Sequence, residues 1–135
     1  MPLRTAVDGE TPRPGTVYFP QEDTHLVLDR QGRLQASREP PVDGHRPSAT
    51  VTFRSVAERY GRAAVAVLLS GMGRDGGAGM ADVLRAGGVT VAQDEASCVV
   101  WGMPRAAVEL GVARLVLPPS EIARLLVEAI RPRPG

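Results

Sequence analysis

The sequence predicts an α/β protein with a parallel sheet, helices packed on that sheet, and a β-hairpin near the N-terminus. The stretch "AAVAVLLS" (63–70) is a continuous apolar run, as expected for a parallel strand that is buried on both faces. Strand-like and helix-like segments alternate after it, and a strand–helix–strand order requires a crossover connection and therefore parallel pairing. With 135 residues, of which 43% are hydrophobic, the chain is sized for one domain with one core.

The first 61 residues are predicted to form a hairpin, a loop and a helix. "TVYFP" (16–20) is typical of a short strand, and "HLVLDRQGRLQAS" (25–37) of a hairpin that turns at Gly32. Prolines keep "REPPVDGHRP" (38–47) irregular. Ser48 is then placed to cap a helix that stops at Gly61. The inward positions of this helix are expected to be Val51, Phe53, Val56 and Ala57.

Residues 62–130 are predicted to form the βαβα portion of the domain, with a tail at 131–135. Glycines lie between several of the expected elements of this region. Ser120 is expected to cap the last helix, whose apolar face would consist of Ile122, Leu125, Leu126 and Ile130. After the strand at 63–70, the expected elements are a helix at 78–86, a strand at 89–94, short helical pieces at 95–102 and 104–111, a strand at 114–118 and a helix at 120–130.

The composition argues against several classes of function. All 16 basic residues are arginine, but 15 acidic residues bring the net charge to +1, and only 4% of residues are aromatic, which does not favour nucleic-acid binding. No run reaches the roughly 18 apolar residues of a membrane span, and the N-terminus has no signal-peptide core. The single cysteine, Cys98, is expected to be a buried, inert thiol. We therefore expect a cytoplasmic protein without membrane insertion.

The stretch "SGMGRDGGAGM" (70–80) follows the buried strand and allows three interpretations. As a dinucleotide fingerprint, Gly71, Gly73 and Gly76 would approach a pyrophosphate, with Asp94 placed for a ribose. Against this, Asp75 lies inside the loop that would touch the phosphates, where like charges repel by about 1–4 kcal/mol. The chain is also short for a domain that holds a full dinucleotide.

The other two interpretations concern Asp75 itself. The glycines could simply permit a sharp strand-to-helix turn that Asp75 caps. Alternatively, Asp75 could be a working acid, held ionised by N–H donors at a helix N-terminus. Such a carboxylate can orient an imidazole and stabilise its protonated form, which is the role of the aspartate in a Ser-His-Asp triad.

Two segments together resemble a known family. "AVLLSGMGRDGGAGM" and "VAQDEASCVVWGMPRAAVELG" are similar to "TGMGxDGAxGM" and "AQDExSSVVxGMPxxA", which are hallmark segments of the chemotaxis protein-glutamate methylesterase (CheB-type) domain. The upstream segments "DGETPRPGTVYFP" and "HRPSATVTFRSVAERYG" resemble the same family, so the resemblance runs from about Asp8 to Ile130. At the hallmark segments, Ser70 stands for a usual threonine, Cys98 for a serine and Gly77 for a common alanine.

The resemblance implies a doubly wound α/β fold and a Ser-His-Asp esterase. Members of the family remove methyl groups, as methanol, from glutamyl methyl esters on chemoreceptors, and many also deamidate receptor glutamines. By resemblance, Asp75 matches the triad aspartate, and Met72 and Gly73 belong to the active-site wall. No cofactor and no metal are implied.

The family's "GASTGG"-like nucleophile segment and "QHMP"-like base segment are not in this sequence. The chain therefore resembles only the C-terminal portion of the domain, and we expect 1–135 to be a single truncated domain that is inactive alone. His25 and His45 match family segments remote from the base and are expected to be structural, and Ser70 has no histidine near it in sequence.

A half domain would leave a buried-type strand with an open edge, so a homodimer or a partner chain is expected to cover it. The expected binding partner is a methylated chemoreceptor or a related signalling protein, with no nucleic acid. A non-catalytic module that binds such a protein is the alternative function, and nucleotide binding through the glycine loop is the second.

Overall fold

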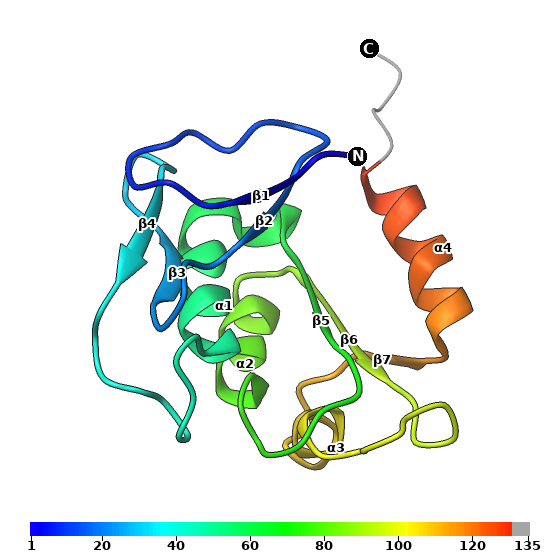
Figure 1. The fold of residues 1–135 in the computed structure, drawn as a ribbon. Coiled ribbons are helices and arrows are strands. Elements are labelled where there is room, and N and C mark those ends of the chain that lie inside the picture. Colours follow the sequence, from blue (N-terminus) through cyan, green and yellow to red (C-terminus); the bar gives the residue numbers. More distant parts are fainter. Residues whose placement is uncertain (131–135) are drawn as a thin grey trace.

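The computed structural model describes residues 1–130 of the chain (Figure 1). Its strands are β1 (Leu3–Thr5), β2 (Val17–Phe19), β3 (His25–Leu28), β4 (Leu34–Ser37), β5 (Val65–Leu68), β6 (Val89–Gln93) and β7 (Leu115–Leu117). Its α-helices are α1 (Ala49–Tyr60), α2 (Gly77–Arg85), α3 (Met103–Glu109) and α4 (Pro119–Ile130), and a 3₁₀ turn, Gly61–Ala63, follows α1. None of these helices is long and apolar enough to cross a membrane.

The main sheet is parallel and has the strand order β5-β6-β7. Val67 pairs with Val91, and Val91 in turn pairs with Leu115, so the three strands share one register. The predicted α/β class with a parallel sheet is therefore confirmed. Strand β5 has a neighbour on one side only, and its other edge carries no strand among the described residues.

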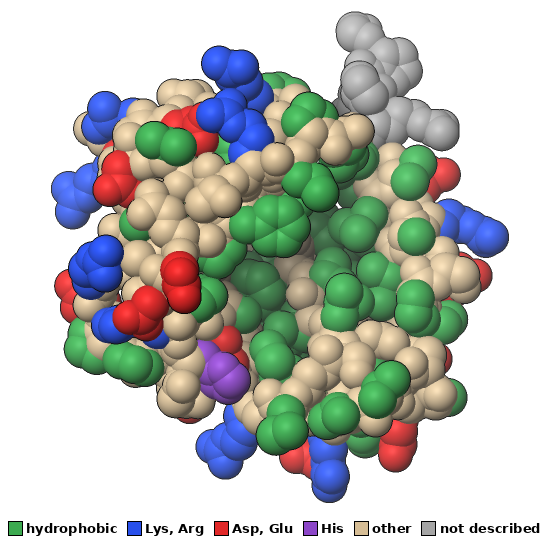
Figure 2. Space-filling model, viewed as in Figure 1, with side chains coloured by type: hydrophobic (Ala, Val, Ile, Leu, Met, Phe, Trp, Pro, Cys, Tyr) green, Lys and Arg blue, Asp and Glu red, His purple; other side chains and the backbone are tan. Residues whose placement is uncertain are grey.

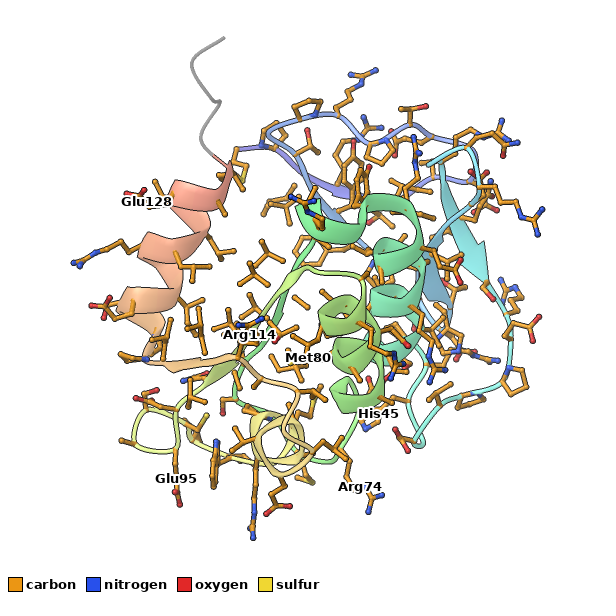
Figure 3. The ribbon with its side chains drawn as sticks, turned by 180° about the vertical axis from the view of Figure 1, so that it is seen from behind. His45, Arg74, Met80, Glu95, Arg114 and Glu128 are labelled. Carbon is orange, nitrogen blue, oxygen red and sulfur yellow. The ribbon has the colours of Figure 1, made fainter. Side chains whose placement is uncertain are left out.

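The core lies between one face of this sheet and α1, α2 and α3. Ala66 and Leu68 of β5 point to that side and pack with Met80 and Val83 of α2 and with Ala107 of α3. Met80 and Val83 are completely buried, and Figure 3 shows Met80 between the helices and the sheet. Helix α4 instead lies beside β6, apart from α1 and α2 in both ribbon views (Figures 1 and 3).

The predicted hairpin is confirmed as antiparallel β3 and β4, with Leu28 paired to Leu34. Ser48 caps α1 as predicted, since its side chain accepts a hydrogen bond from the backbone N–H of Val51, and α1 ends at Gly61. One strand was not predicted: β1 pairs in parallel with β2. All three residues of β1 are exposed, so no apolar pattern marks it in the sequence.

Two predicted elements are wrong in detail. Residues 95–102 form turns and bends rather than a helical piece. Helix α4 begins at Pro119, so Ser120 lies inside the first turn instead of capping it. A proline suits this first helical position because its missing N–H would have no intrahelical partner there. The predicted tail at 131–135 lies outside the described residues.

Candidate functional site

Two loops meet at the carboxyl edge of the sheet, where α/β proteins place their sites. The loop after β5 contains Gly71, and the loop after β6 contains Val100 and Gly102. The backbone N–H of Gly71 donates to the carbonyl of Val100 (3.0 Å), and the N–H of Gly102 donates back to the carbonyl of Gly71 (3.0 Å). A Cβ at Gly102 would lie 2.6 Å from the Gly71 carbonyl oxygen, so only glycine allows this contact. The glycines therefore fix the two loops against each other.

Asp75 is buried in this region and is 3% exposed. Its carboxylate accepts hydrogen bonds from the Ser48 hydroxyl (2.6 Å), the Ala49 backbone N–H (2.6 Å) and the Thr50 backbone N–H (3.3 Å). These groups form the N-terminus of α1, where unpaired N–H groups and the helix dipole favour an anion. All three neighbours donate, so the surroundings match an ionised carboxylate, which can only accept.

The interpretation of Asp75 as a cap of the following helix is wrong in one respect, because Asp75 caps α1 and not α2. The N-cap of α2 is Gly76, whose positive φ of 101° suits glycine. The N–H groups of Gly76 and Gly79 donate to the Thr50 hydroxyl at 2.9 and 3.4 Å. Asp75, just before α2, thus accepts from N–H groups at the start of α1, and Thr50, in the first turn of α1, accepts from N–H groups at the start of α2. These bonds use N–H groups that a pyrophosphate would need, so the loop offers no phosphate cradle at Gly76 and Gly79.

A serine, a histidine and an aspartate do meet here, but not as a triad. The His25 ring is completely buried; its Nδ1 accepts from the Ser48 backbone N–H (3.0 Å), and its Nε2–H donates to the Pro40 carbonyl (3.0 Å). The Ser48 hydroxyl donates directly to Asp75, so no imidazole lies between the two side chains. His25 is a structural histidine in this geometry, as predicted.

The other candidate residues lie on the rim. Met72 is 77% exposed and Gly73 is also exposed. His45 is half-buried, and a Cβ at Gly73 would lie 3.2 Å from its Nε2. The Ser70 hydroxyl is occupied by the backbone of Val100, whose N–H donates to it at 3.0 Å. Among the residues the structure describes, no other histidine and no serine stands in triad geometry with Asp75.

A cleft of about 550 Å³ lies beside β5, and Asp75 is one of the residues that line it. Its lining comes from α1, α3, the β2–β3 region, β5 and the loops before α1 and after β5. It is mostly apolar and includes Tyr18, Leu26, Phe53, Val67, Leu69 and Met103. Figure 2 shows hydrophobic side chains gathered in a hollow on this face, with a histidine at its lower rim. Asp75 therefore lies in the wall of an open cleft whose other lining residues are mostly apolar.

The described residues contain no group of three His, Cys, Asp or Glu side chains that could hold a metal ion. Cys98 is half-buried rather than fully buried. Burial raises the pKa of its thiol, and the nearby negative charge of Asp94 raises it further, while a hydrogen bond with Ser70 acts in the opposite direction. The raised pKa favours the protonated thiol; the predicted full burial is wrong, and the inert state stays a prediction.

Sequence reasoning found Asp75 but missed the residues that hold it. Ser48 was expected only as a helix cap, and Thr50 was not singled out. Their contacts with the glycine loop span 25 to 27 residues of sequence. The only available signal was a cap serine placed just before a helix, which says nothing about a distant carboxylate.

The parallel sheet and its helices define the class as α/β. The buried carboxylate lies in a glycine loop at the carboxyl ends of the strands, where proteins of this class place their sites. Comparison with known proteins specifies the class: the family described as CheB methylesterase matches residues 1–126. The chain therefore belongs to the CheB methylesterase family.

The chain is also similar in sequence to individual proteins whose names include methylesterase. The chain is 49% identical over 125 residues to protein-glutamate methylesterase/protein-glutamine glutaminase 3 of Burkholderia lata, covering 90% of this chain and 34% of that protein. It is 47% identical to protein-glutamate methylesterase/protein-glutamine glutaminase 4 of Myxococcus xanthus, covering 97% and 37%. The chain thus spans about a third of the length of these relatives.

A solved structure shows the same fold. The crystal structure of the Thermotoga maritima CheB methylesterase catalytic domain aligns with a TM-score of 0.88 and 38% sequence identity. The alignment covers 92% of this chain and 67% of that domain. One third of the solved domain therefore has no counterpart in the aligned part of this chain.

Proposed function

We propose that this chain supplies the aspartate-bearing part of a protein-glutamate methylesterase and glutaminase site that acts on methylated chemoreceptors. The observation that carries the proposal is the buried Asp75 carboxylate, which is fixed by three donors and lines an open cleft. The family membership and the names of the relatives support the reaction class.

In this mechanism, Asp75 accepts an N–H from an imidazole and holds the ring with its other nitrogen toward a serine hydroxyl. The imidazole takes the serine proton as the serine oxygen attacks the ester carbonyl, and returns that proton to the departing methoxide, so methanol leaves. Water then attacks the acyl-serine by the same route and frees the glutamate side chain. Asp75 stays ionised throughout and stabilises the imidazolium that forms in each step.

The chain is proposed to be inactive alone because the histidine and serine side chains near Asp75 make hydrogen bonds that stabilise the fold. His25 uses both ring nitrogens on the backbone, and the Ser48 hydroxyl donates to Asp75. The Ser70 hydroxyl bonds to the Val100 backbone. The nucleophile and the base must then come from other polypeptide, in the same protein or in a partner.

We further propose that this polypeptide lies along the unpaired edge of β5. The strand offers free backbone N–H and C=O groups there, and the cleft beside it is lined mostly by apolar side chains. A second copy of this chain could also cover the edge and give a homodimer. Only a segment with a serine and a histidine would complete the site, so activity separates the two arrangements.

A second candidate function is a non-catalytic module that binds a receptor or signalling protein. Val99 is 94% exposed and Met72 is 77% exposed, and both lie on the loops at the carboxyl edge of the sheet. Exposed apolar side chains on rigid loops are typical contact residues of binding surfaces. This function would need no serine or histidine.

The test is to co-express the chain with a polypeptide that carries a "GASTGG…QHMP" segment and to measure methanol release from methylated receptor. The wild-type pair should be active and either part alone inactive. Asp75→Asn should lower kcat by about 10³–10⁴-fold, because it removes the group that orients the base. Asp43→Asn, at an exposed carboxylate in the loop before α1, is the matched control and should leave the rate unchanged.

Two results would refute the proposal. Hydrolysis by the purified chain alone would show that it contains its own nucleophile. An active pair that is insensitive to Asp75→Asn, with folding and association intact by circular dichroism and light scattering, would remove Asp75 from the mechanism. Receptor binding by the chain together with an inactive pair would favour the non-catalytic module.

A further inference from the structure

We propose that Ser48 is a positioning residue that sets the orientation of the Asp75 carboxylate and directs its Oδ2 atom to the incoming imidazole. The inference rests on the proposed function, because it assigns a role within the same site. It goes beyond that function by naming the oxygen that binds the base and the side chain that fixes this choice.

The two oxygens of Asp75 differ in their bonding. Oδ1 accepts from the Ser48 hydroxyl at 2.6 Å and from the Thr50 N–H at 3.3 Å, whereas Oδ2 accepts only from the Ala49 N–H at 2.6 Å. A carboxylate oxygen has two in-plane lone pairs. Oδ1 is therefore saturated, and Oδ2 keeps one lone pair for a further donor.

Ser48 is itself fixed, so its hydroxyl proton has one destination. Its backbone N–H donates to Nδ1 of the buried His25, and its Oγ accepts from the Val51 N–H at 3.4 Å. Ser48 is 1% exposed, which leaves little room for water to compete for the hydroxyl proton. The remaining Ser48 O–H donates to Asp75, at a distance typical of a bond to a charged acceptor.

His25 anchors the outer end of this chain of contacts. Its Nε2–H donates to the Pro40 carbonyl, so the ring cannot turn without losing a hydrogen bond at each nitrogen. The order Pro40, His25, Ser48, Asp75 links the loop before α1 to the carboxylate. Removing the Ser48 hydroxyl would leave Oδ1 with only the longer bond from the Thr50 N–H, so the carboxylate would be held less firmly in its orientation.

A rotated carboxylate would misplace the imidazole, and a misplacement of about 1 Å can cost up to about 100-fold in rate. Ser48→Ala should therefore lower kcat of the active pair by about 10- to 100-fold with KM unchanged. Ser55→Ala is the matched control, because Ser55 is a half-buried serine on the same helix that accepts from the Leu28 N–H at 3.1 Å, far from Asp75. It should leave kcat within about twofold.

Double-mutant cycles separate positioning from general loss of structure. In the chain alone, Ser48→Ala should lower the folding equilibrium constant in both backgrounds, because the cap on the Val51 N–H is lost in each. The loss should be at least about threefold larger in the wild type than with Asp75→Asn, because only the wild type also loses the bond to the carboxylate. Ser55→Ala should have the same effect in both backgrounds. In the active pair, Ser48→Ala should add no further loss of kcat to Asp75→Asn.

Each outcome decides one of the two proposals. Equal effects of Ser48→Ala on unfolding in both backgrounds would overturn the contact, whatever the activity. A coupled contact with unchanged kcat in an active pair would overturn the positioning role. A coupled contact in a wild-type pair without activity would refute the proposed esterase function, and the positioning role with it, while the contact itself would stand.

Discussion

Helices α1 and α2 approach each other closely at Gly79, and a substitution there tests whether this packing stabilises the fold around the site. Gly79 lies inside α2 and faces α1. A Cβ added to it would lie 2.6 Å from the Cα and the carbonyl oxygen of Thr50 and 2.9 Å from the Cβ of Phe53. These are backbone or near-backbone atoms, so Gly79→Ala can be accommodated only by separating the helices.

The expected cost follows from opposing effects. The closest atoms would be about 0.8 Å nearer than the 3.4 Å at which ordinary contact begins, and such overpacking costs about 1–3 kcal/mol. Shifting Thr50 also weakens its hydrogen bonds with the N–H groups of Gly76 and Gly79, at about 0.5–1.5 kcal/mol each. The higher helix propensity of alanine returns about 1 kcal/mol. The free energy of unfolding should thus fall by about 1–5 kcal/mol, with a midpoint of about 3 kcal/mol.

The matched control is Gly77→Ala, two residues earlier in the same helix. A Cβ there would meet the Leu110 Cδ1 at 2.9 Å, which is the end of a flexible side chain that is 62% exposed. Leu110 can rotate away, so the free energy of unfolding should change by less than about 0.5 kcal/mol.

Urea unfolding followed by far-ultraviolet circular dichroism measures both variants, with thermal unfolding as a second assay. Gly79→Ala should lower Tm by roughly 5–10 °C. The reasoning is refuted if Gly79→Ala is as stable as the wild type, or if Gly77→Ala costs as much as Gly79→Ala. A reduced slope of the urea transition for Gly79→Ala would instead mean that the comparison is no longer two-state.

Three further predictions concern titratable side chains. The pKa of Asp29 is lowered to about 2, first by a hydrogen bond from the backbone N–H of Arg33 and then by one from the Gln35 side chain. The stability that Asp29 contributes is present above its unfolded pKa of 3.8 and is lost as the pH falls toward 2. In Asp29→Asn, the free energy of unfolding should therefore change less with pH below about pH 4 than it does in the wild type. His25→Ala should lower the free energy of unfolding by about 2–4 kcal/mol in urea titrations, and His45→Ala by less than about 1 kcal/mol; equal losses would contradict the buried anchoring role. Because burial and Asp94 raise the pKa of Cys98, thiol reagents at pH 7 should modify it more slowly in the folded than in the urea-unfolded protein, and equal rates would argue against this environment.

Local signals in the sequence were sufficient for most of the fold. The Ser48 cap, the turn at Gly32 and the apolar strand before the glycine loop each depend on neighbouring residues, and each predicted element is present. The helical prediction for 95–102 failed because its apolar residues are not buried: Val99 is 94% exposed. This segment instead forms a turn in which the Ser97 N–H donates to the Asp94 carboxylate, and it then pairs with the loop at Gly71.

The site was predictable only in part, for a physical reason. A glycine loop after a strand marks where a functional residue can lie, and Asp75 is the acidic residue in that loop. The groups that determine its orientation lie at the N-terminus of α1, 27 and 26 residues earlier in the chain. Which helix end receives a carboxylate depends on how α1 and α2 pack, and no local pattern encodes that packing.

The contacts that pack α1 against α2 stabilise the fold and also hold Asp75 in the position that the proposed mechanism needs. Asp75 caps α1, Thr50 of α1 binds the first N–H groups of α2, and Gly79 lets the two helices approach closely enough for both contacts. A carboxylate placed only for catalysis would gain stability when neutralised, because its desolvation cost would disappear. Here Asp75→Asn replaces one of two acceptor oxygens with an NH₂ group, which cannot accept from the Ser48, Ala49 or Thr50 donors that surround the carboxylate. The substitution should therefore lower the free energy of unfolding by about 1–3 kcal/mol in urea titrations of the chain alone. A variant more stable than the wild type would mean that the carboxylate is strained in its pocket and that α1 does not depend on it.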